Sequence, residues 1–158
     1  MTRPLDRTDL GLLAALRSNP KASHAELARD VGIARGTVYS RLDRLEAEGV
    51  IAGYGPDIDA TRAGLGVLAF TTLEISQGSH DETVRALAAI IEVIEVNTVT
   101  GSGDLLCRIV ARSNDHLHDI LQRVADVATV QRSQSQLALA TAHRRSVIDV
   151  VLATRSLT

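Results

Sequence analysis

The sequence is poor in residue types on which whole classes of proteins depend. Its 158 residues include one cysteine, no tryptophan and only three other aromatic residues, Phe70, Tyr39 and Tyr54. A single cysteine excludes an internal disulfide and any zinc site built from several thiolates, as is typical of a reducing compartment. Three scattered rings cannot form the row of aromatic platforms on which proteins stack single-stranded nucleic acid. The hydrophobic cores must therefore be aliphatic.

Long apolar runs and a strong excess of one charge are also missing. No run approaches the roughly 20 residues of a membrane span, and the first residues lack the apolar segment of a signal peptide. The chain has 17 Lys+Arg against 19 Asp+Glu, a formal net charge of −2. This balance argues against a generally polybasic nucleic-acid binder but leaves room for a localised basic face. We therefore expect a cytoplasmic protein with no membrane partner.

Helical periodicity and explicit start signals mark the first fifty residues. Asp6 can cap a first helix, because its carboxylate can accept hydrogen bonds from the free amides of the first turn. Ser23 and Glu26 have the spacing of a capping box, which predicts the start of a second helix. A third helix is expected from about residue 34 to 48, and Gly49 stands where a helix-terminating glycine would. A helix followed by helix, short turn and helix predicts a helix-turn-helix DNA-binding domain.

The segment after the third helix changes character. Residues 50–56 have the composition of a short strand with turns, which predicts a wing or an exit from the domain. Residues 56–64 then form a linker. We therefore expect an N-terminal winged helix-turn-helix domain in residues 1–55.

Residues 65–142 predict a second domain with the order strand, helix, strand, strand, helix, strand. Apolar alternation marks the strands, and Gly101–Asp104 has the composition of a hairpin turn. This order is that of a ferredoxin-like βαββαβ domain, so the whole chain is expected to be α+β. Two helices would cover one sheet face, and dimerisation would cover the other. Residues 143–158 are a C-terminal extension, expected to add a strand or a partner contact.

The third predicted helix carries the candidate DNA-binding side chains. At 100° per residue, the hydroxyl and arginine side chains share one arc, and the apolar positions are expected roughly opposite. Arginine and hydroxyl groups suit a major groove. The bland alternative is a set of solvated arginines, but the capped helix pair beside them favours DNA. The predicted DNA-binding residues are Ser23, which is also the helix cap, Arg35, Gly36, Thr37, Ser40, Arg41 and Arg44.

These motifs, taken in order, resemble the leucine-responsive/asparagine-responsive (Lrp/AsnC) family of transcription regulators. The likeness extends from Leu5 to about Thr141. It depends on Leu5-Asp6-x-x-Asp9, Glu26-Leu27-Ala28-x-x-Val31-Gly32, Val38-x-x-Arg41-Leu42-x-x-Leu45-Glu46-x-x-Gly49-Val50-Ile51-x-Gly53-Tyr54, and Val99-Thr100-Gly101-x-x-Asp104.

The resemblance implies double-stranded DNA as a partner, a small-molecule effector such as an amino acid, and homodimers that assemble to a higher oligomer such as an octamer. The implied effector-binding residues are Gly101, Ser102, Gly103, Asp104 and Leu105. Backbone amides of a glycine turn can hold a carboxylate, and Asp104 can pair with an ammonium group. The alternative is a tight hairpin whose glycines only permit a positive φ. The turn lacks the aromatic residue that family members commonly carry.

Nothing in the sequence favours an enzyme. There is no nucleophile motif and no metal-ligand spacing, and Cys107 is expected to be a small buried residue in a strand. We therefore expect no catalytic residues, no metal and no cofactor. Two other functions remain open: an Lrp-like tetrapyrrole decarboxylase, which the intact helix-turn-helix disfavours, and a ligand-sensing oligomer that does not bind DNA.

Overall fold

The structure, a computed structural model, describes residues 3–155. The chain divides into two compact units. One unit joins Met1–Pro56 to His143–Thr158, and the other is Asp57–Ala142. Each unit has a hydrophobic core of its own.

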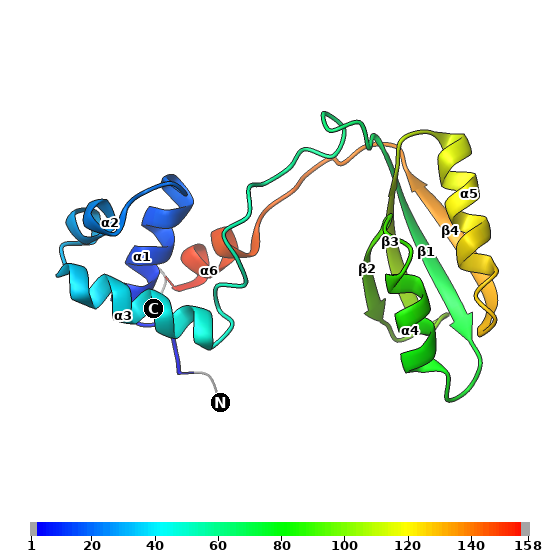
Figure 1. Cartoon of the computed structure of the whole chain (residues 1–158), viewed down its shortest axis with the longest axis horizontal. Helices are drawn as coiled ribbons and strands as arrows, with labels where there is room; N and C mark the ends of the chain where they lie inside the picture. The colour runs from blue at the N-terminus through cyan, green and yellow to red at the C-terminus, as the bar shows by residue number, and fades with distance from the viewer. Residues whose placement is uncertain (1–2, 156–158) are drawn as a thin grey trace. The chain divides into compact units, whose positions relative to one another are not determined.

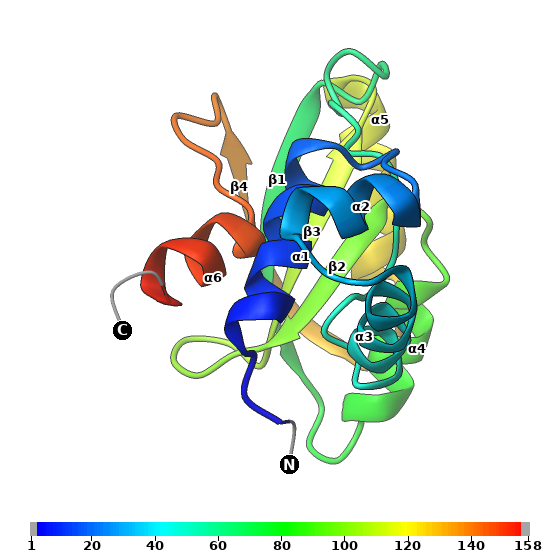
Figure 2. The same ribbon diagram turned by 90° about the vertical axis from the view of Figure 1, so that its left-hand side faces the viewer.

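The first unit begins with three helices, α1 (Arg7–Ser18), α2 (His24–Val31) and α3 (Arg35–Ala47) (Figures 1 and 2). Capping residues define where the first two helices begin. Asp6 caps α1 and Ser23 caps α2, and each forms a capping box with the residue three positions later. Leu12, Leu27 and other aliphatic side chains meet between the helices. The predicted helix-turn-helix is therefore confirmed.

Two glycines end α2 and α3. Gly32 and Gly49 have φ of 72° and 70°, the left-handed region in which a side chain is strained. After α3, the Val50 amide donates to the Leu45 carbonyl at 2.8 Å and the Gly49 amide to the Glu46 carbonyl at 2.9 Å. These two bonds form a Schellman motif, as the glycine at position 49 predicts.

The predicted wing strand is wrong. Residues 50–56 form neither strand nor helix. They are instead attached to α3 by Tyr54, whose hydroxyl donates to Glu46 Oε1 at 2.6 Å. Burial, followed by this bond, raises the pKa of Tyr54 to about 12. The β-branched pair Val50 and Ile51 has no neighbouring strand with which to pair, so it stays irregular.

The predicted C-terminal strand is also wrong, because residues 147–155 form helix α6 (Val147–Arg155). This helix contacts α1 within the first unit (Figure 2). Arg17 Nε on α1 lies 3.2 Å from Asp149 Oδ1. A run of β-branched residues indicates a strand by propensity, but contacts with α1 favour a helix here.

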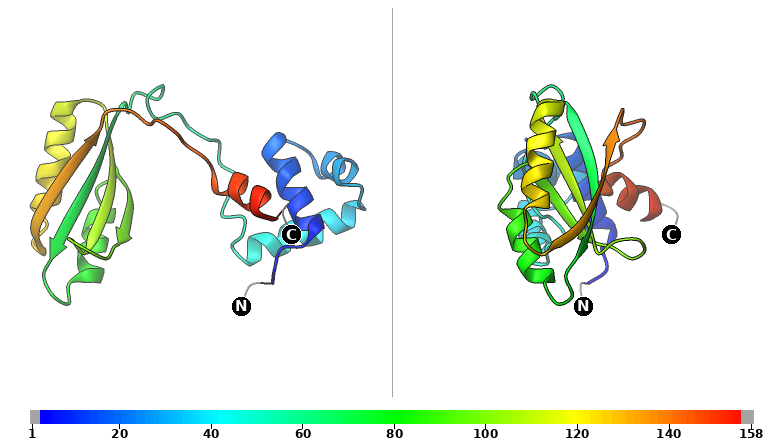
Figure 3. Two further views of the ribbon diagram at one scale, coloured as in Figure 1. Left: turned by 180° about the vertical axis from the view of Figure 1, so that it is seen from behind. Right: turned by 90° about the vertical axis from the view of Figure 1, so that its right-hand side faces the viewer.

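The second unit contains a four-stranded antiparallel sheet with the order β2-β3-β1-β4, and the ferredoxin-like prediction is confirmed (Figure 1). Two helices cover one face of the sheet, and the strands are open to view on the other (Figure 3). The elements are β1 (Val67–Ile75), α4 (His80–Ala88), β2 (Val93–Thr98), β3 (Leu105–Ala111), α5 (Asn114–Ala125) and β4 (Val130–Ala138).

Alternation along the strands separates a packed face from an open one. On β1, Ala69, Thr71 and Leu73 are fully buried against the helices, and Phe70 between them is 36% exposed. Cys107 on β3 is fully buried in the same core, as expected, and burial raises the pKa of its thiol to about 11. Such a thiol is unreactive.

The spacing of Ser79 and Glu82 in the sequence predicts a capping box at the start of helix α4, which the structure does not form. Ser79 precedes α4 but makes no side-chain capping bond. Its hydroxyl donates backward to the Ser76 carbonyl at 2.6 Å. The helical spacing of Leu87 and Ile91 predicts Ile91 on the packed side of this helix, but Ile91 lies beyond the end of α4 and is 83% exposed. No helix among residues 3–155 is long and apolar enough to cross a membrane.

Candidate DNA-binding surface and effector pocket

The solvent-facing side of α3 carries different residues from those of the predicted arc. Val38, Leu42 and Leu45 are buried and fix the inner side of the helix. At 100° per residue, Arg41 lies about 60° from Val38 and about 40° from Leu45, beside the buried stripe rather than opposite it. In the N-terminal half of α3, the exposed side chains are those of Arg35, Tyr39 and Ser40, and Gly36 is exposed beside them.

Arg41 and Arg44 are held by carboxylates of α1. Arg41 Nη1 donates to Asp6 Oδ2 and, at 2.9 Å, to Asp9 Oδ1. Arg44 Nη2 lies 2.6 Å from Asp9 Oδ1, an ion pair without hydrogen-bond geometry. Both arginine side chains are only about a quarter exposed, at 25% and 22%. The predicted free basic face is therefore wrong for these two residues, because their guanidinium groups attach α3 to α1.

The electrostatics of this cluster favour its charged state. The hydrogen bond from Arg41 lowers the pKa of Asp6 to about 2. Burial alone would raise the pKa of Asp9, but the Arg44 ion pair and the hydrogen bonds from the Asp6 amide and from Arg41 outweigh it and lower that pKa. Asp9 is fully buried, so its charge is stabilised by these partners and not by water. Asp6 and Asp9 belong to the first family-like motif of the sequence, but no local pattern indicates that they bind Arg41 and Arg44.

The other predicted DNA-binding residues lie along α3 and at the start of α2. Thr37 is half-buried, and its carbonyl accepts from Ser40 Oγ at 3.2 Å. Ser23 Oγ is occupied by Glu26, with an Oγ–Oε2 distance of 2.7 Å. Ala34 caps α3 without a side-chain bond. The first amides of α3 thus lack the side-chain acceptor that α1 and α2 have, and a phosphate can supply one.

Tyr39 was missed by the sequence prediction. Its side chain is 53% exposed. Its ring packs edge-on against His24 of α2, with centroids 4.1 Å apart and planes at 79°. An exposed ring held at the junction of α2 and α3 can contact a thymine methyl or a sugar. The sequence feature that could have identified Tyr39 is its position one residue after the buried Val38, because this position turns the Tyr39 side chain away from the core.

The turn from residue 101 to 104 is built tightly against the end of β1. Gly101 has φ of 112°. A Cβ at Gly103 would collide with Thr72 Cγ2 and lie 3.2 Å from the Leu73 carbonyl oxygen. The Asp104 amide donates to that Leu73 carbonyl at 2.8 Å, and Asp104 Oδ2 accepts from the Ile75 amide at 2.8 Å. Gly101 thus has a conformational reason to be glycine and Gly103 a steric one.

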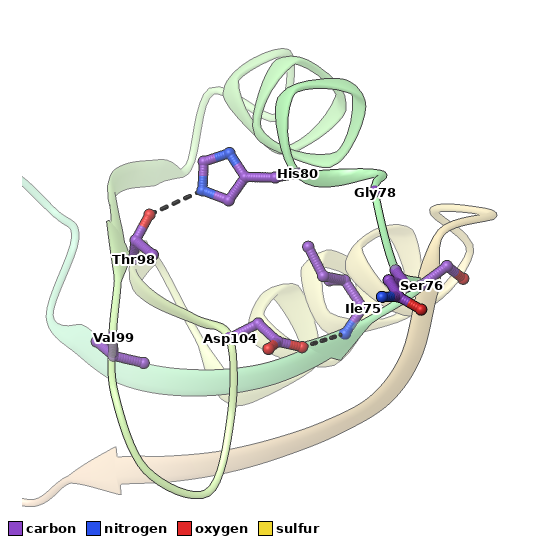
Figure 4. A pocket seen from close by; sticks show the side chains of 8 residues that line it. Ile75, Ser76, Gly78, His80, Thr98, Val99 and Asp104 are labelled. Carbon is purple, nitrogen blue, oxygen red and sulfur yellow. Dashed lines mark hydrogen bonds between the residues drawn. The ribbon is translucent and has the colours of Figure 1, made fainter.

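A pocket of about 290 Å³ lies beside this turn (Figure 4). His80 extends from the start of α4 toward Thr98, and the two are joined by a 2.8 Å contact between Nε2 and Oγ1 (Figure 4). Asp104 lies across from them and bonds to the β1 end (Figure 4). The lining residues are Ile75, Ser76, Gln77, Gly78, His80, Thr98, Val99 and Asp104.

Of the five predicted effector residues, only Asp104 lines this pocket. Leu105 is fully buried in the core, so its predicted contact with an effector is not supported by this geometry. Gly101, Ser102 and Gly103 form the adjoining turn, outside the lining. The missed residues come from two separate segments, the stretch from the end of β1 to the start of α4 and the end of β2 with Val99 after it, and the fold brings the two segments together. No cluster of three or more metal-ligating side chains occurs in the described part of the chain.

Comparison with known proteins assigns each unit to a family. Residues 5–52 match the winged helix-turn-helix DNA-binding family, and residues 68–148 match the Lrp/AsnC ligand binding domain. The HTH-type transcriptional regulator Rv2324 of Mycobacterium tuberculosis is 32% identical over 136 residues, covering 85% of this chain and 92% of that protein. The regulator Ptr1 of Methanocaldococcus jannaschii is 31% identical over 138 residues, covering 87% and 93%.

Solved structures show the same two-part fold. Escherichia coli AsnC has a TM-score of 0.85 at 24% identity, covering 92% of this chain and 99% of that one. A regulator of Neisseria meningitidis, NMB0573, solved as a complex with L-Met, has a TM-score of 0.75 at 25% identity, covering 89% and 94%.

Proposed function

The chain belongs to the Lrp/AsnC family of transcription regulators, and we propose that it is a sequence-specific DNA-binding regulator modulated by an amino acid. The helix-turn-helix, with both capping boxes formed, is the observation that carries the DNA-binding function. Such a protein acts on the chromosome, so we expect it in the cytoplasm, and no enzymatic step is needed.

We propose that the exposed side of α3 reads the major groove. Arg35, Gly36 and Thr37 lie in the first turn, where recognition helices contact base edges, and Tyr39 and Ser40 follow on the next turn. A Cβ added at Gly36 would meet no atom within 4 Å, so the backbone can approach DNA there. Ser23 is placed for a phosphate contact at the start of α2. Arg41 and Arg44 then act mainly by orienting α3 on α1, with any contact to phosphate secondary.

The pocket beside Asp104 is the proposed effector site. Asp104 uses Oδ2 for the Ile75 amide, which leaves its other oxygen to accept from an ammonium group. Hydroxyl, amide and imidazole groups of Ser76, Gln77, Thr98 and His80 suit a polar or carboxylate end. In the relative from Neisseria meningitidis the bound molecule is L-Met. These features support an amino-acid effector for this chain.

We propose that the open sheet face forms a homodimer, from which a larger assembly such as an octamer is built. Phe70 and its neighbours leave apolar surface on this face, and a second copy would cover it. In a dimer, two α3 helices would meet half-sites about 34–36 Å apart, or a multiple of that distance. An effector that binds one assembly more tightly than another would thereby change DNA affinity.

Binding to the duplex upstream of the chain's own coding sequence tests the DNA function. We expect wild-type protein to bind this duplex more tightly than an unrelated duplex of equal length. Its affinity should fall as the salt concentration rises. Arg35→Ala should reduce the discrimination by about 1–3 kcal/mol if Arg35 contacts guanine. Equal affinity of the wild type for upstream and unrelated fragments would contradict the proposal.

Thermal unfolding with each amino acid tests the effector site. A ligand at about 100 times its dissociation constant should stabilise the protein by about 2.7 kcal/mol. Asp104→Asn should abolish that shift, whereas Asp115→Asn on the exposed start of α5 should preserve it. A shift that survives Asp104→Asn would place the effector elsewhere.

A further inference from the structure

Arg144 and Arg145 form an exposed basic pair in the first unit, just before α6. Neither guanidinium group forms an ion pair or hydrogen bond with any residue between 3 and 155. Most arginines near α1 and α3 are different: Arg17, Arg41 and Arg44 are each paired with an aspartate. These two adjacent exposed cations add no ion pair to the described part of this unit, so both guanidinium groups are available to bind an anion.

The pair is anchored close to the helix-turn-helix by the first turn of α6. Arg17 of α1 binds both carboxylate oxygens of Asp149, at 3.2 and 3.5 Å. Asp149 Oδ2 also accepts from the Ser146 amide at 3.1 Å and from Ser146 Oγ at 2.9 Å. Consecutive Cα atoms are about 3.8 Å apart, so the Cα atoms of both arginines lie within about 8 Å of Ser146. Their position relative to α1 is therefore restricted.

The C-terminal segment changes the charge of the DNA-binding unit. Residues 1–56 hold 8 Lys+Arg against 7 Asp+Glu, a net charge of +1. Residues 143–158 add three arginines and one aspartate, which makes the whole unit +3. Residues 57–142 hold 6 against 11, a net charge of −5. Because α6 packs on α1, the added positive charge belongs to the unit with the helix-turn-helix.

We propose that Arg144 and Arg145 bind phosphates of the DNA backbone beside the site read by α3. This inference rests on the proposed DNA-binding function. Guanidinium groups match phosphate oxygens in a two-pronged geometry, and such contacts add affinity and register without reading sequence. The C-terminal segment is then a second DNA contact, positioned by the Arg17–Asp149 pair. It belongs to the unit in which residues 50–56 form no wing strand.

Salt-dependent DNA binding by the full-length chain tests this inference. The variant is Arg144→Gln/Arg145→Gln, and the matched control is Arg85→Gln/Arg112→Gln, which removes two exposed charges from the other unit. The probes are the upstream duplex and an unrelated duplex of equal length. In the 144/145 variant, the slope of log affinity against log salt concentration should fall in magnitude by about 2 for each bound protomer. Its affinity for both duplexes should fall by the same factor, about tenfold or more at low salt. Arg144→Lys/Arg145→Lys should retain most of the slope.

Three outcomes separate the possibilities. If the 144/145 variant and its control have the same slope and affinity, the inference is overturned while the proposed function stands. If the 144/145 variant changes the assembly state in sedimentation but not DNA binding, the pair serves contacts between protomers and the inference is also overturned. If the wild type binds neither duplex, the proposed function itself fails.

Discussion

Asp9 is the carboxylate on which both arginines of α3 converge. It is fully buried on α1, and Arg41 and Arg44 contact the same oxygen atom. Removing it would leave two guanidinium groups partly buried with less countercharge. We expect Asp9→Ala to lower the free energy of unfolding by about 2–4 kcal/mol, measured by urea denaturation. Asp43→Ala, on the exposed side of α3, should change it by no more than about 0.5 kcal/mol. Equal effects would contradict the role of the cluster.

Asp6 gives the cluster a pH dependence. Its pKa in the folded chain is about 2, against 3.8 for an ordinary aspartate. A lowered pKa means that the carboxylate stabilises the fold above pH 3.8 and loses this effect as pH falls toward 2. Asp6→Asn keeps a capping oxygen but removes the charge. The difference in unfolding free energy between wild type and Asp6→Asn should be constant above about pH 5 and shrink below about pH 4. A difference that does not vary with pH would show that the Arg41 pairing is absent.

At the scale of the element, Gly36 inside α3 and Gly49 just after its end should respond oppositely to alanine. Gly49 has φ of 70°, so Gly49→Ala should destabilise the chain by about 1 kcal/mol. Gly36 has an ordinary helical backbone and no crowding atoms, so Gly36→Ala should stabilise it, by up to about 1 kcal/mol. The added methyl should nevertheless weaken DNA binding if α3 enters the groove there. Thermal unfolding and DNA affinity, measured on the same variants, check both expectations.

Elements with local causes were predictable from the sequence. The caps at Asp6 and Ser23, and the terminating glycines, involve residues within a few positions of each other, and the structure forms them as expected. Propensity was misleading in residues 147–152, where contact with α1 makes a β-branched run helical. The capping prediction at Ser79 failed because its hydroxyl finds the Ser76 carbonyl instead.

The candidate site was less predictable because its contacts are distant in sequence. Arg41 binds Asp9, which lies 32 positions away in the sequence, so no local pattern shows that the arginine has an ion-pair partner. The pocket brings the β1–α4 loop to β2 and the residue-104 turn, and only Asp104 was identified in advance. The helical arithmetic placed Arg41 and Arg44 on the exposed side of the third helix, whereas the structure places Arg41 beside its buried stripe and pairs both arginines with Asp9.

At the scale of the whole molecule, the open sheet face is the surface proposed for dimerisation. Phe70 is 36% exposed on this face, between core residues of β1. Phe70→Glu would bury a carboxylate in the proposed dimer interface, and we expect dimerisation to weaken at least about a hundredfold. Ile91→Glu, just beyond the end of α4 and 83% exposed, is the matched control. Sedimentation that gives the same mass for wild type and Phe70→Glu would show that dimers use another surface.

The most direct test of the whole account is genome-wide mapping of the DNA bound by wild-type protein and by Arg35→Ala. A regulator that reads DNA with α3 should enrich a limited set of fragments that share pseudo-palindromic half-sites, spaced by about one helical turn or a multiple of it. Arg35→Ala, with its fold intact, should lose that shared sequence while retaining weak binding without sequence preference. Wild-type protein that enriches no shared sequence would contradict the central claim.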